Sequence, residues 1–175
     1  MVQKTTYRMP YKRRRKLKTD YRQRIELLKS GKPRLVVRKT NKYIIAQIVK
    51  SKEAQDYTVL GITSKILQKY GWKYSFKNLP ACYLTGLIIG KLALKNGIKE
   101  AILDIGLNRV TKGNRIFAVI KGAIDAGLKI PHSNEVLPSE DRIKGLHIAN
   151  YLEKFKDLPK DFEEIKQKIL KEYGS

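Results

Sequence analysis

The order of apolar patterns along the chain restricts its fold more than any other feature. β-like runs occur at residues 34–38, 43–49, 57–62 and 100–105. Helical apolar spacing occurs at residues 80–96 and 116–126. The first two runs flank a short polar turn, which predicts a hairpin, and the later run–helix alternation predicts a sheet covered by helices. The expected fold class is therefore α/β.

Both ends of the chain add helices to this α/β part, and the N-terminal end also adds a flexible arm. Thr19 or Asp20 can cap a helix that stops before Pro33. Two further helical patterns follow residue 131, and Asp161 and Glu164 are spaced as a capping box for the second. We therefore predict three segments: a basic flexible arm (1–18), an α/β domain (19–130) and a mostly helical C-terminal extension (131–175).

Charge is distributed very unevenly over these segments. The 175 residues include 38 Lys and Arg against 16 Asp and Glu, a net charge of +22. Residues 1–50 hold 17 basic and 2 acidic side chains, whereas residues 131–175 hold 8 and 9. This excess indicates a polyanionic partner, either nucleic acid or an anionic membrane surface. No apolar run reaches the roughly 20 residues of a spanning helix, and the basic start lacks the apolar stretch of a secretory signal, so we expect a soluble intracellular protein.

The basic arm has the composition of a nucleic-acid contact. Arginine and lysine match phosphate oxygens, and interleaved tyrosines can stack on unpaired bases. The candidate residues in the arm are Tyr11, Lys12, Arg13, Arg14, Arg15 and Lys16. A solvated tail or a nuclear address would have a similar composition. In the adjoining hairpin, Arg34 and Arg38 share one face of a strand, so we expect them to project together toward RNA.

The polar loop at residues 106–115 is a second candidate contact with phosphate. It contains Asn108, Arg109, Lys112 and Arg115 and leads into the N-terminus of a helix, where anions are favoured. Its glycine spacing does not fit a P-loop, and an ordinary connection between strand and helix is the alternative.

Enzymatic signatures are sparse. Asp104, with Asp125 and Glu135, could hold the metal of a nuclease, although a strand aspartate more often pairs with a basic neighbour. His132 and His147 lack the spacing of metal ligands, and the single cysteine, Cys82, excludes an internal disulfide and fits a packing role. We expect no catalytic residue, no metal and no cofactor.

Three long blocks, residues 18–49, 95–107 and 122–148, resemble the archaeal branch of the large-subunit ribosomal protein family eighteen, whose eukaryotic counterpart is large-subunit protein five. The resemblance implies a non-catalytic protein that binds 5S rRNA and anchors it to the large-subunit rRNA in the central protuberance. It also implies a three-layer α/β/α mixed sheet similar to the ribonuclease H topology.

Further expectations follow from this resemblance. The family's RNA-contacting region corresponds to Lys12 to Lys16, Arg22, Arg24, Arg34, Arg38, Thr40, Asn41 and Lys42, and the adjacent Tyr43 is a further candidate contact. The expected partners are 5S rRNA, the large-subunit rRNA and neighbouring ribosomal proteins, including the other 5S-binding protein, in the cytoplasmic ribosome. A non-specific DNA-packaging protein would have a similar composition but not these three blocks.

Overall fold

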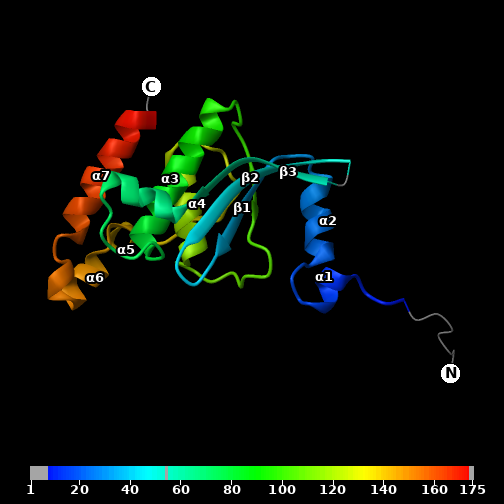
Figure 1. Cartoon of the computed structure of the whole chain (residues 1–175), viewed down its shortest axis with the longest axis horizontal. Helices are drawn as coiled ribbons and strands as arrows, with labels where there is room; N and C mark the ends of the chain where they lie inside the picture. Colours follow the sequence, from blue (N-terminus) through cyan, green and yellow to red (C-terminus); the bar gives the residue numbers. More distant parts are fainter. Residues whose placement is uncertain (1–7, 54, 174–175) are drawn as a thin grey trace.

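A computed structural model of the chain describes residues 8–53 and 55–173 and contains one mixed sheet (Figure 1). Its described strands are β1 (Arg34–Lys39), β2 (Ile44–Lys52), β3 (Gln55–Thr63) and β4 (Ile102–Asp104), in the order β3-β2-β1-β4. The first three pair antiparallel, while β4 lies parallel to β1. A parallel bridge between Glu100 and Lys129 continues the sheet beyond β4. This arrangement confirms the predicted α/β class.

The hairpin forms because apolar residues alternate along both strands. Leu35 and Val37 on β1 and Ala46 and Ile48 on β2 are fully buried and pack toward the helices. The Thr40 backbone N–H donates to the Tyr43 carbonyl at 2.8 Å and closes the turn. The register, with Arg34 opposite Val49, confirms the predicted hairpin.

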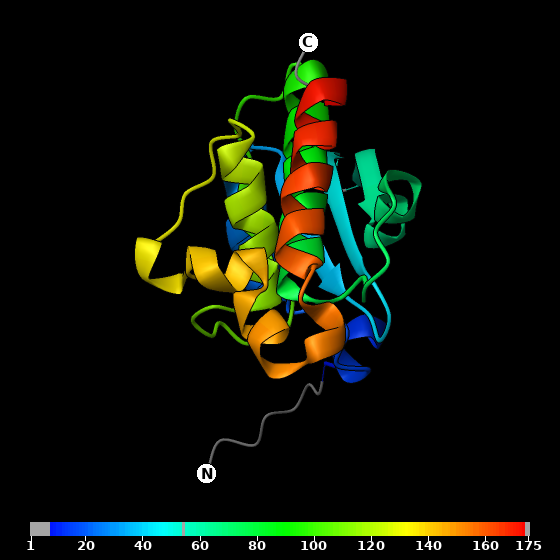
Figure 2. The same cartoon turned by 90° about the vertical axis from the view of Figure 1, so that its left-hand side faces the viewer.

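Helices α3 (Leu79–Lys95), α4 (Arg115–Asp125) and α7 (Leu158–Tyr173) form the layers on one side of the sheet (Figures 1 and 2). Asn78 caps α3 by accepting a hydrogen bond from the Ala81 N–H, and Pro80 fits the first turn, where no donor is needed. Helix α7 packs on the outer side of α3 (Figure 2) and buries Phe162, Ile165 and Ile169 in the same core cluster. Among the described helices, none is long and apolar enough to cross a membrane.

Helix α2 (Tyr21–Lys29) lies on the opposite side of the sheet and supplies the remaining layer (Figure 1). The Asp20 carboxylate accepts hydrogen bonds from the N–H groups of Arg22 and Gln23, which confirms the predicted helix start. Helices on both sides of a mixed sheet agree with the expected three layers. No residue of α2, all of which is described, is buried, so this side of the sheet stays partly open.

Shorter elements connect these layers. They are α1 (Lys12–Arg15), η1 (Ser64–Tyr70), η2 (Asn134–Val136), α5 (Glu140–Lys144), α6 (Leu146–Tyr151) and η3 (Glu153–Phe155). The predicted capping box at Asp161 is wrong, because α7 already begins at Leu158. Asp161 instead accepts a hydrogen bond from the Tyr74 hydroxyl at 2.8 Å, which ties α7 to the loop before α3.

Candidate nucleic-acid interface

The β1–β2 turn, the 106–115 loop and α1 lie toward the same end of the molecule, the lower side of Figure 1, and each of them carries exposed cations. We call this surface the basic edge. Its exposed members are Lys12, Arg13, Arg14, Arg15, Lys16, Lys39, Asn41, Lys42, Arg109, Lys112 and Arg115. Leu107 of the loop lines a common hollow with Arg14 and Arg22, so the loop and the arm are direct neighbours.

The basic arm differs from its expected form at Lys12–Arg15. Residues 1–7 lie outside the described residues, but the next segment forms one helical turn, α1, with all four side chains exposed. Arg13 Nε donates to Thr19 Oγ1 at 2.9 Å, and the rings of Tyr11 and Tyr21 lie 5.1 Å apart. These contacts fold the arm back against the start of α2 and leave its remaining cations facing solvent.

At the hairpin turn, the candidate residues divide into structural and accessible ones. The Thr40 hydroxyl donates to the Tyr43 carbonyl at 2.9 Å and accepts from the Tyr43 N–H at 3.0 Å, so it is used within the turn. Tyr43 packs against Phe76, with ring centroids 5.8 Å apart. The side chains of Asn41 and Lys42 are exposed at the tip.

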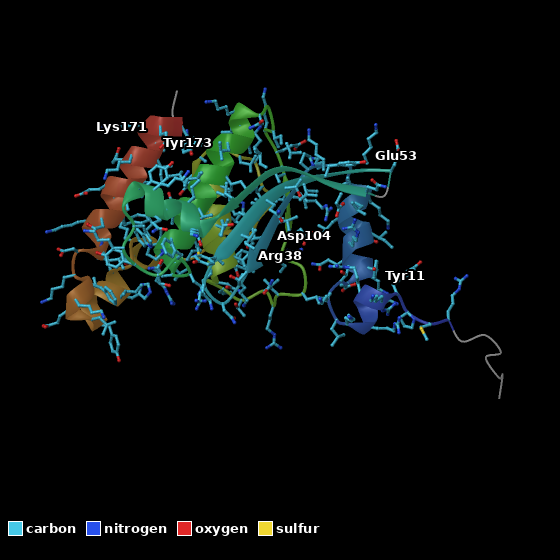
Figure 3. The ribbon with its side chains drawn as sticks, in the orientation of Figure 1. Tyr11, Arg38, Glu53, Asp104, Lys171 and Tyr173 are labelled. Atoms are coloured by element: carbon cyan, nitrogen blue, oxygen red, sulfur yellow. The ribbon has the colours of Figure 1, made fainter. Side chains whose placement is uncertain are left out.

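Arg34 and Arg38 do share one face of β1, but they meet aspartates of the protein there. Arg34 donates to Asp104 at 2.9 Å and to Asp56 at 2.7 Å, with 3% of its side chain exposed. Arg38 donates to the other Asp104 oxygen at 2.7 Å and to the Asp104 carbonyl, and 40% of its side chain is exposed. Figure 3 shows Arg38 and Asp104 side by side. The prediction that Arg34 faces RNA does not fit this position, because its guanidinium is buried and already donates to two carboxylates.

Asp56 of β3 joins the same cluster and connects it to α2. Arg24 of α2 donates to Asp56 at 2.7 Å, so Asp56 pairs with arginines from two elements. The hydrogen bond from Arg24, with a further one from Arg34, lowers the pKa of Asp56 from 3.8 to about 2. Sequence reasoning missed Asp56, since nothing local distinguishes it from other exposed acids. Arg22, by contrast, is exposed on α2.

In the 106–115 loop, the candidates again differ in accessibility. The Asn108 side-chain amide donates to the Ile105 carbonyl at 2.7 Å and shapes the loop. Lys112 pairs with Glu135 at 3.1 Å, with three quarters of each side chain exposed. Arg109 and Arg115 are exposed and pair with no carboxylate of the described chain. The loop can therefore offer two arginines to a phosphate backbone.

The carboxylates of the nuclease alternative do not converge. Asp104 is enclosed by Arg34 and Arg38, Asp125 accepts from Lys121 and the Tyr83 hydroxyl, and Glu135 pairs with Lys112. Within residues 8–53 and 55–173, no group of three or more potential metal ligands occurs. The arrangement therefore gives no support to metal-dependent cleavage.

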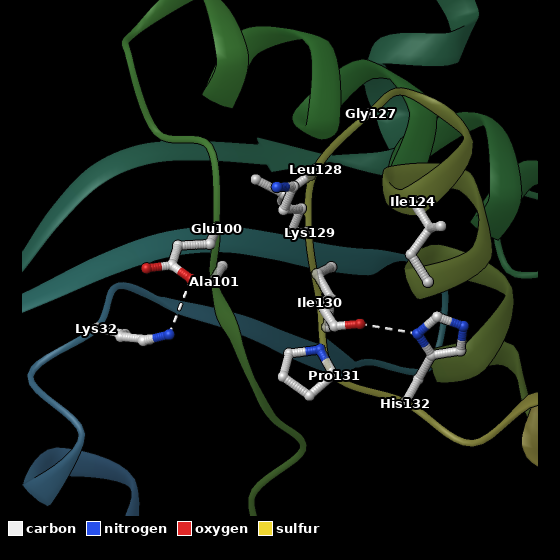
Figure 4. Close-up of a pocket in the computed structure, with 10 residues that line it drawn as sticks. All are labelled: Lys32, Glu100, Ala101, Ile124, Gly127, Leu128, Lys129, Ile130, Pro131 and His132. Atoms are coloured by element: carbon white, nitrogen blue, oxygen red, sulfur yellow. Dashed lines mark hydrogen bonds and ion pairs between the residues drawn. The ribbon is translucent and has the colours of Figure 1, made fainter.

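The remaining reactive side chains are held apart as well. His132 lies in a largely apolar pocket of about 410 Å³, where its Nδ1 is 2.7 Å from the Ile130 carbonyl (Figure 4). His147 lines a different hollow, next to Arg142. Cys82 is fully buried at the start of α3, and burial raises the pKa of its thiol to about 12, which fits the predicted packing role.

Comparison with known proteins gives the chain close relatives. The family model for ribosomal large subunit proteins 60S L5 and 50S L18 matches residues 5–102 and 93–133. The large ribosomal subunit protein uL18 of Caldivirga maquilingensis is 45% identical over 197 residues, covering 99% of this chain and 95% of the relative. The protein of the same name from Korarchaeum cryptofilum is 52% identical over 157 residues, covering 90% and 80%.

Proposed function

This chain belongs to the archaeal branch of the uL18 family of large-subunit ribosomal proteins, and from this premise we propose that it binds 5S rRNA and anchors it to the large-subunit rRNA in the central protuberance. Its family makes it a structural, non-enzymatic protein of the ribosome, as expected from the sequence. The finer assignment is supported by one observation, the basic edge, which presents cations from three separate segments on one side of the molecule.

The basic edge suits a double-helical or folded RNA better than a small anion. Its cations come from α1, the hairpin turn and the 106–115 loop, so they span several phosphates at once. Tyr11 is 73% exposed beside the arm cations and can stack on an unpaired base. Contact over this breadth would join two RNA segments, which is what anchoring one rRNA to another requires.

The arginine–aspartate cluster gives this surface its shape. Asp104 and Asp56 hold Arg34, Arg38 and Arg24, and so join β1, β3, β4 and α2. In this proposal Arg34 and Arg24 position the interface, whereas the exposed part of Arg38 is available to RNA. Arg22, Asn41, Lys42, Arg109 and the α1 cations make the remaining contacts.

Neighbouring ribosomal proteins, including the other 5S-binding protein, are assigned to the C-terminal segment. This segment carries almost no net charge, and Tyr151 and Leu152 expose 83% and 40% of their surface there. An exposed aromatic residue beside an aliphatic one is typical of protein contacts rather than of phosphate contacts.

The test is a competition for labelled 5S rRNA against excess transfer RNA over a range of salt concentrations. Selective binding should survive the competitor, and about six phosphate contacts should give a log–log salt slope near −4 to −5. Binding that declines in proportion to the competitor's phosphate would contradict the proposal and favour a non-specific polycation, including the DNA-packaging alternative.

Two variants with three substitutions each test whether α1 contacts the RNA. Replacing Arg13, Arg14 and Arg15 with Gln should flatten the salt slope by about 2 to 3. The matched control replaces Lys160, Lys168 and Lys171 with Gln, removing three exposed cations from α7, which lies at the opposite end of the molecule from α1 (Figure 1). Equal effects of the two triples would rule out a specific role for α1.

A further inference from the structure

A polar hollow of about 560 Å³ opens between the α/β part of the chain and helices α5 and α6. The end of β1, the loop before α4, and helices α5 and α6 all contribute to its wall. Its charged and titratable residues are Lys39, Lys112, Arg115, Arg142 and His147. Four cations and one histidine thus come together from segments more than 100 residues apart in the sequence.

This hollow contains cations that the protein does not neutralise. Only Lys112 has an acidic partner, Glu135, while Lys39, Arg115 and Arg142 form no ion pair within the described part of the chain. The cleft on the sheet face under α2 is the opposite case, because Asp56 and Asp104 neutralise its buried arginines. Like charges held together repel one another, and an anion from outside removes that repulsion.

Core packing fixes the C-terminal half of the hollow. Arg142 lies on α5 and His147 on α6, and Gly145 joins the two helices with a φ of 80°. A Cβ at Gly145 would collide with the Leu158 side chain, so the turn is packed tightly against α7. Ile143, between the two residues, is buried. Arg142 and His147 are therefore presented by a rigid corner rather than by a loose tail.

We propose that this hollow binds a phosphodiester group of ribosomal RNA, contacted by Arg115 from α4 and Arg142 from α5. Two guanidinium groups from different elements can donate hydrogen bonds to the oxygens of one phosphate from two directions. Lys39, Lys112 and His147 line the same hollow. The inference rests on the proposed function for the identity of the RNA, and it extends the basic edge to the C-terminal helices.

His147 provides a direct reporter of the bound anion. Partial burial and, secondly, the neighbouring Arg142 hold the pKa of His147 below its usual value. An anion in the hollow favours the imidazolium form and raises that pKa. The chain has one other histidine, His132, which lies in the separate pocket of Figure 4 and serves as an internal control.

The experiment follows both histidine rings by NMR during a pH titration of the intact protein, in sodium sulfate and in sodium chloride of equal ionic strength. Sulfate keeps its charge throughout and mimics the phosphate oxygens. The pKa of His147 should rise by roughly half a unit or more in sulfate, with that of His132 unchanged. The Arg115→Gln, Arg142→Gln double variant should lose this response. Equal shifts of both histidines, or none, would overturn the proposal.

Binding to RNA provides the second measurement. The Arg115→Gln, Arg142→Gln variant should bind 5S rRNA about tenfold more weakly at 0.15 M salt, with a salt slope flatter by about 1. The control, Lys168→Gln with Lys171→Gln, should bind as the parent does; equal weakening in the control would count against the hollow. If selectivity for 5S rRNA fails while His147 responds to sulfate, the proposed function is wrong and the anion site stands. Intact selectivity without any effect of the double variant overturns the site alone.

Discussion

Arg34 and Arg38 lie on the same face of β1, yet their side chains have different surroundings. Arg34 is enclosed between Asp104 and Asp56, whereas Arg38 shares Asp104 and keeps 40% of its side chain in solvent. A buried charge that loses its partner is far more costly than an exposed one, because solvent cannot replace the lost contact. The two residues should therefore respond differently to the same substitution.

Arg34→Gln should lower the free energy of unfolding by about 3 kcal/mol, since it removes a buried guanidinium that donates to both Asp104 and Asp56. Arg38→Gln should cost about 1 kcal/mol, in line with a partly exposed ion pair. Urea denaturation of the two variants measures the difference. Equal losses would show that the surroundings of Arg34 do not determine its contribution.

The lowered pKa of Asp56 predicts that the free energy of unfolding decreases at acid pH. Because Arg24 and Arg34 lower its pKa from 3.8 to about 2, the folded state binds this proton less readily than the unfolded state. The resulting stabilisation is present above 3.8 and is lost as the pH falls from there toward 2. With a third of the side chain exposed, screening reduces the effect to about 1 kcal/mol. Asp56→Asn should thus destabilise the protein at pH 7 but not near pH 2, as measured by thermal melts; a difference that persists at pH 2 would contradict this assignment.

Among the elements, the crossing of α3 and α4 depends on glycines from both helices. A Cβ at Gly86 would overlap the Val119 carbonyl, and a Cβ at Gly122 would overlap the Tyr83 carbonyl. Each glycine thus lets the backbone of the other helix approach closely. Gly90, one turn further along α3, makes a similar close approach, since its Cβ would lie 2.6 Å from the Ala126 Cβ.

Gly86→Ala should lower the free energy of unfolding by about 3 kcal/mol, because backbone atoms cannot move aside as side chains can. Gly61→Ala is the matched control, since its Cβ would meet the Gln47 side chain at an ordinary 3.6 Å. Urea midpoints of the two variants give the comparison. A Gly86→Ala protein as stable as the control would mean that the two helices separate at little cost.

In the molecule as a whole, the C-terminal helix shares the core of the α/β part. Phe162 is buried against Tyr83 of α3, with ring centroids 5.7 Å apart, and Tyr173 meets the Tyr70 hydroxyl at 3.2 Å. One contiguous core predicts one unfolding transition, even though residues 131–175 differ from the rest in charge.

Phe162→Ala should therefore shift a single transition, with a loss of about 3 to 5 kcal/mol. Trp72, the one tryptophan, is 3% exposed and packs against Tyr74, which in turn contacts Phe155, so its fluorescence reports the contact between the α/β part and the C-terminal segment. Its midpoint in urea should move together with that of far-UV circular dichroism. Separate midpoints for the two probes would instead favour a C-terminal segment that unfolds independently.

The local sequence was sufficient to predict most elements. The hairpin, the start of α2 at Asp20 and the long helix after Asn78 follow from alternation, capping and proline position, which depend on neighbours a few residues away. The capping box at Asp161 is wrong because α7 already begins at Leu158, and the Asp161 carboxylate accepts a hydrogen bond from Tyr74. Capping residues predict a helix start reliably only where the sequence does not allow the helix to begin further upstream.

The amino-acid sequence alone determined the α/β class, the cationic character of the first 50 residues and the need for a polyanionic partner, since periodicity and charge are properties of the chain itself. Only the tertiary structure decided which cations remain accessible. Arg34 is buried in ion pairs with carboxylates 22 and 70 residues away in the sequence. Helix packing brings Arg115 and Arg142 to one hollow. Pairing at such separations depends on how layers pack, and no local pattern encodes it.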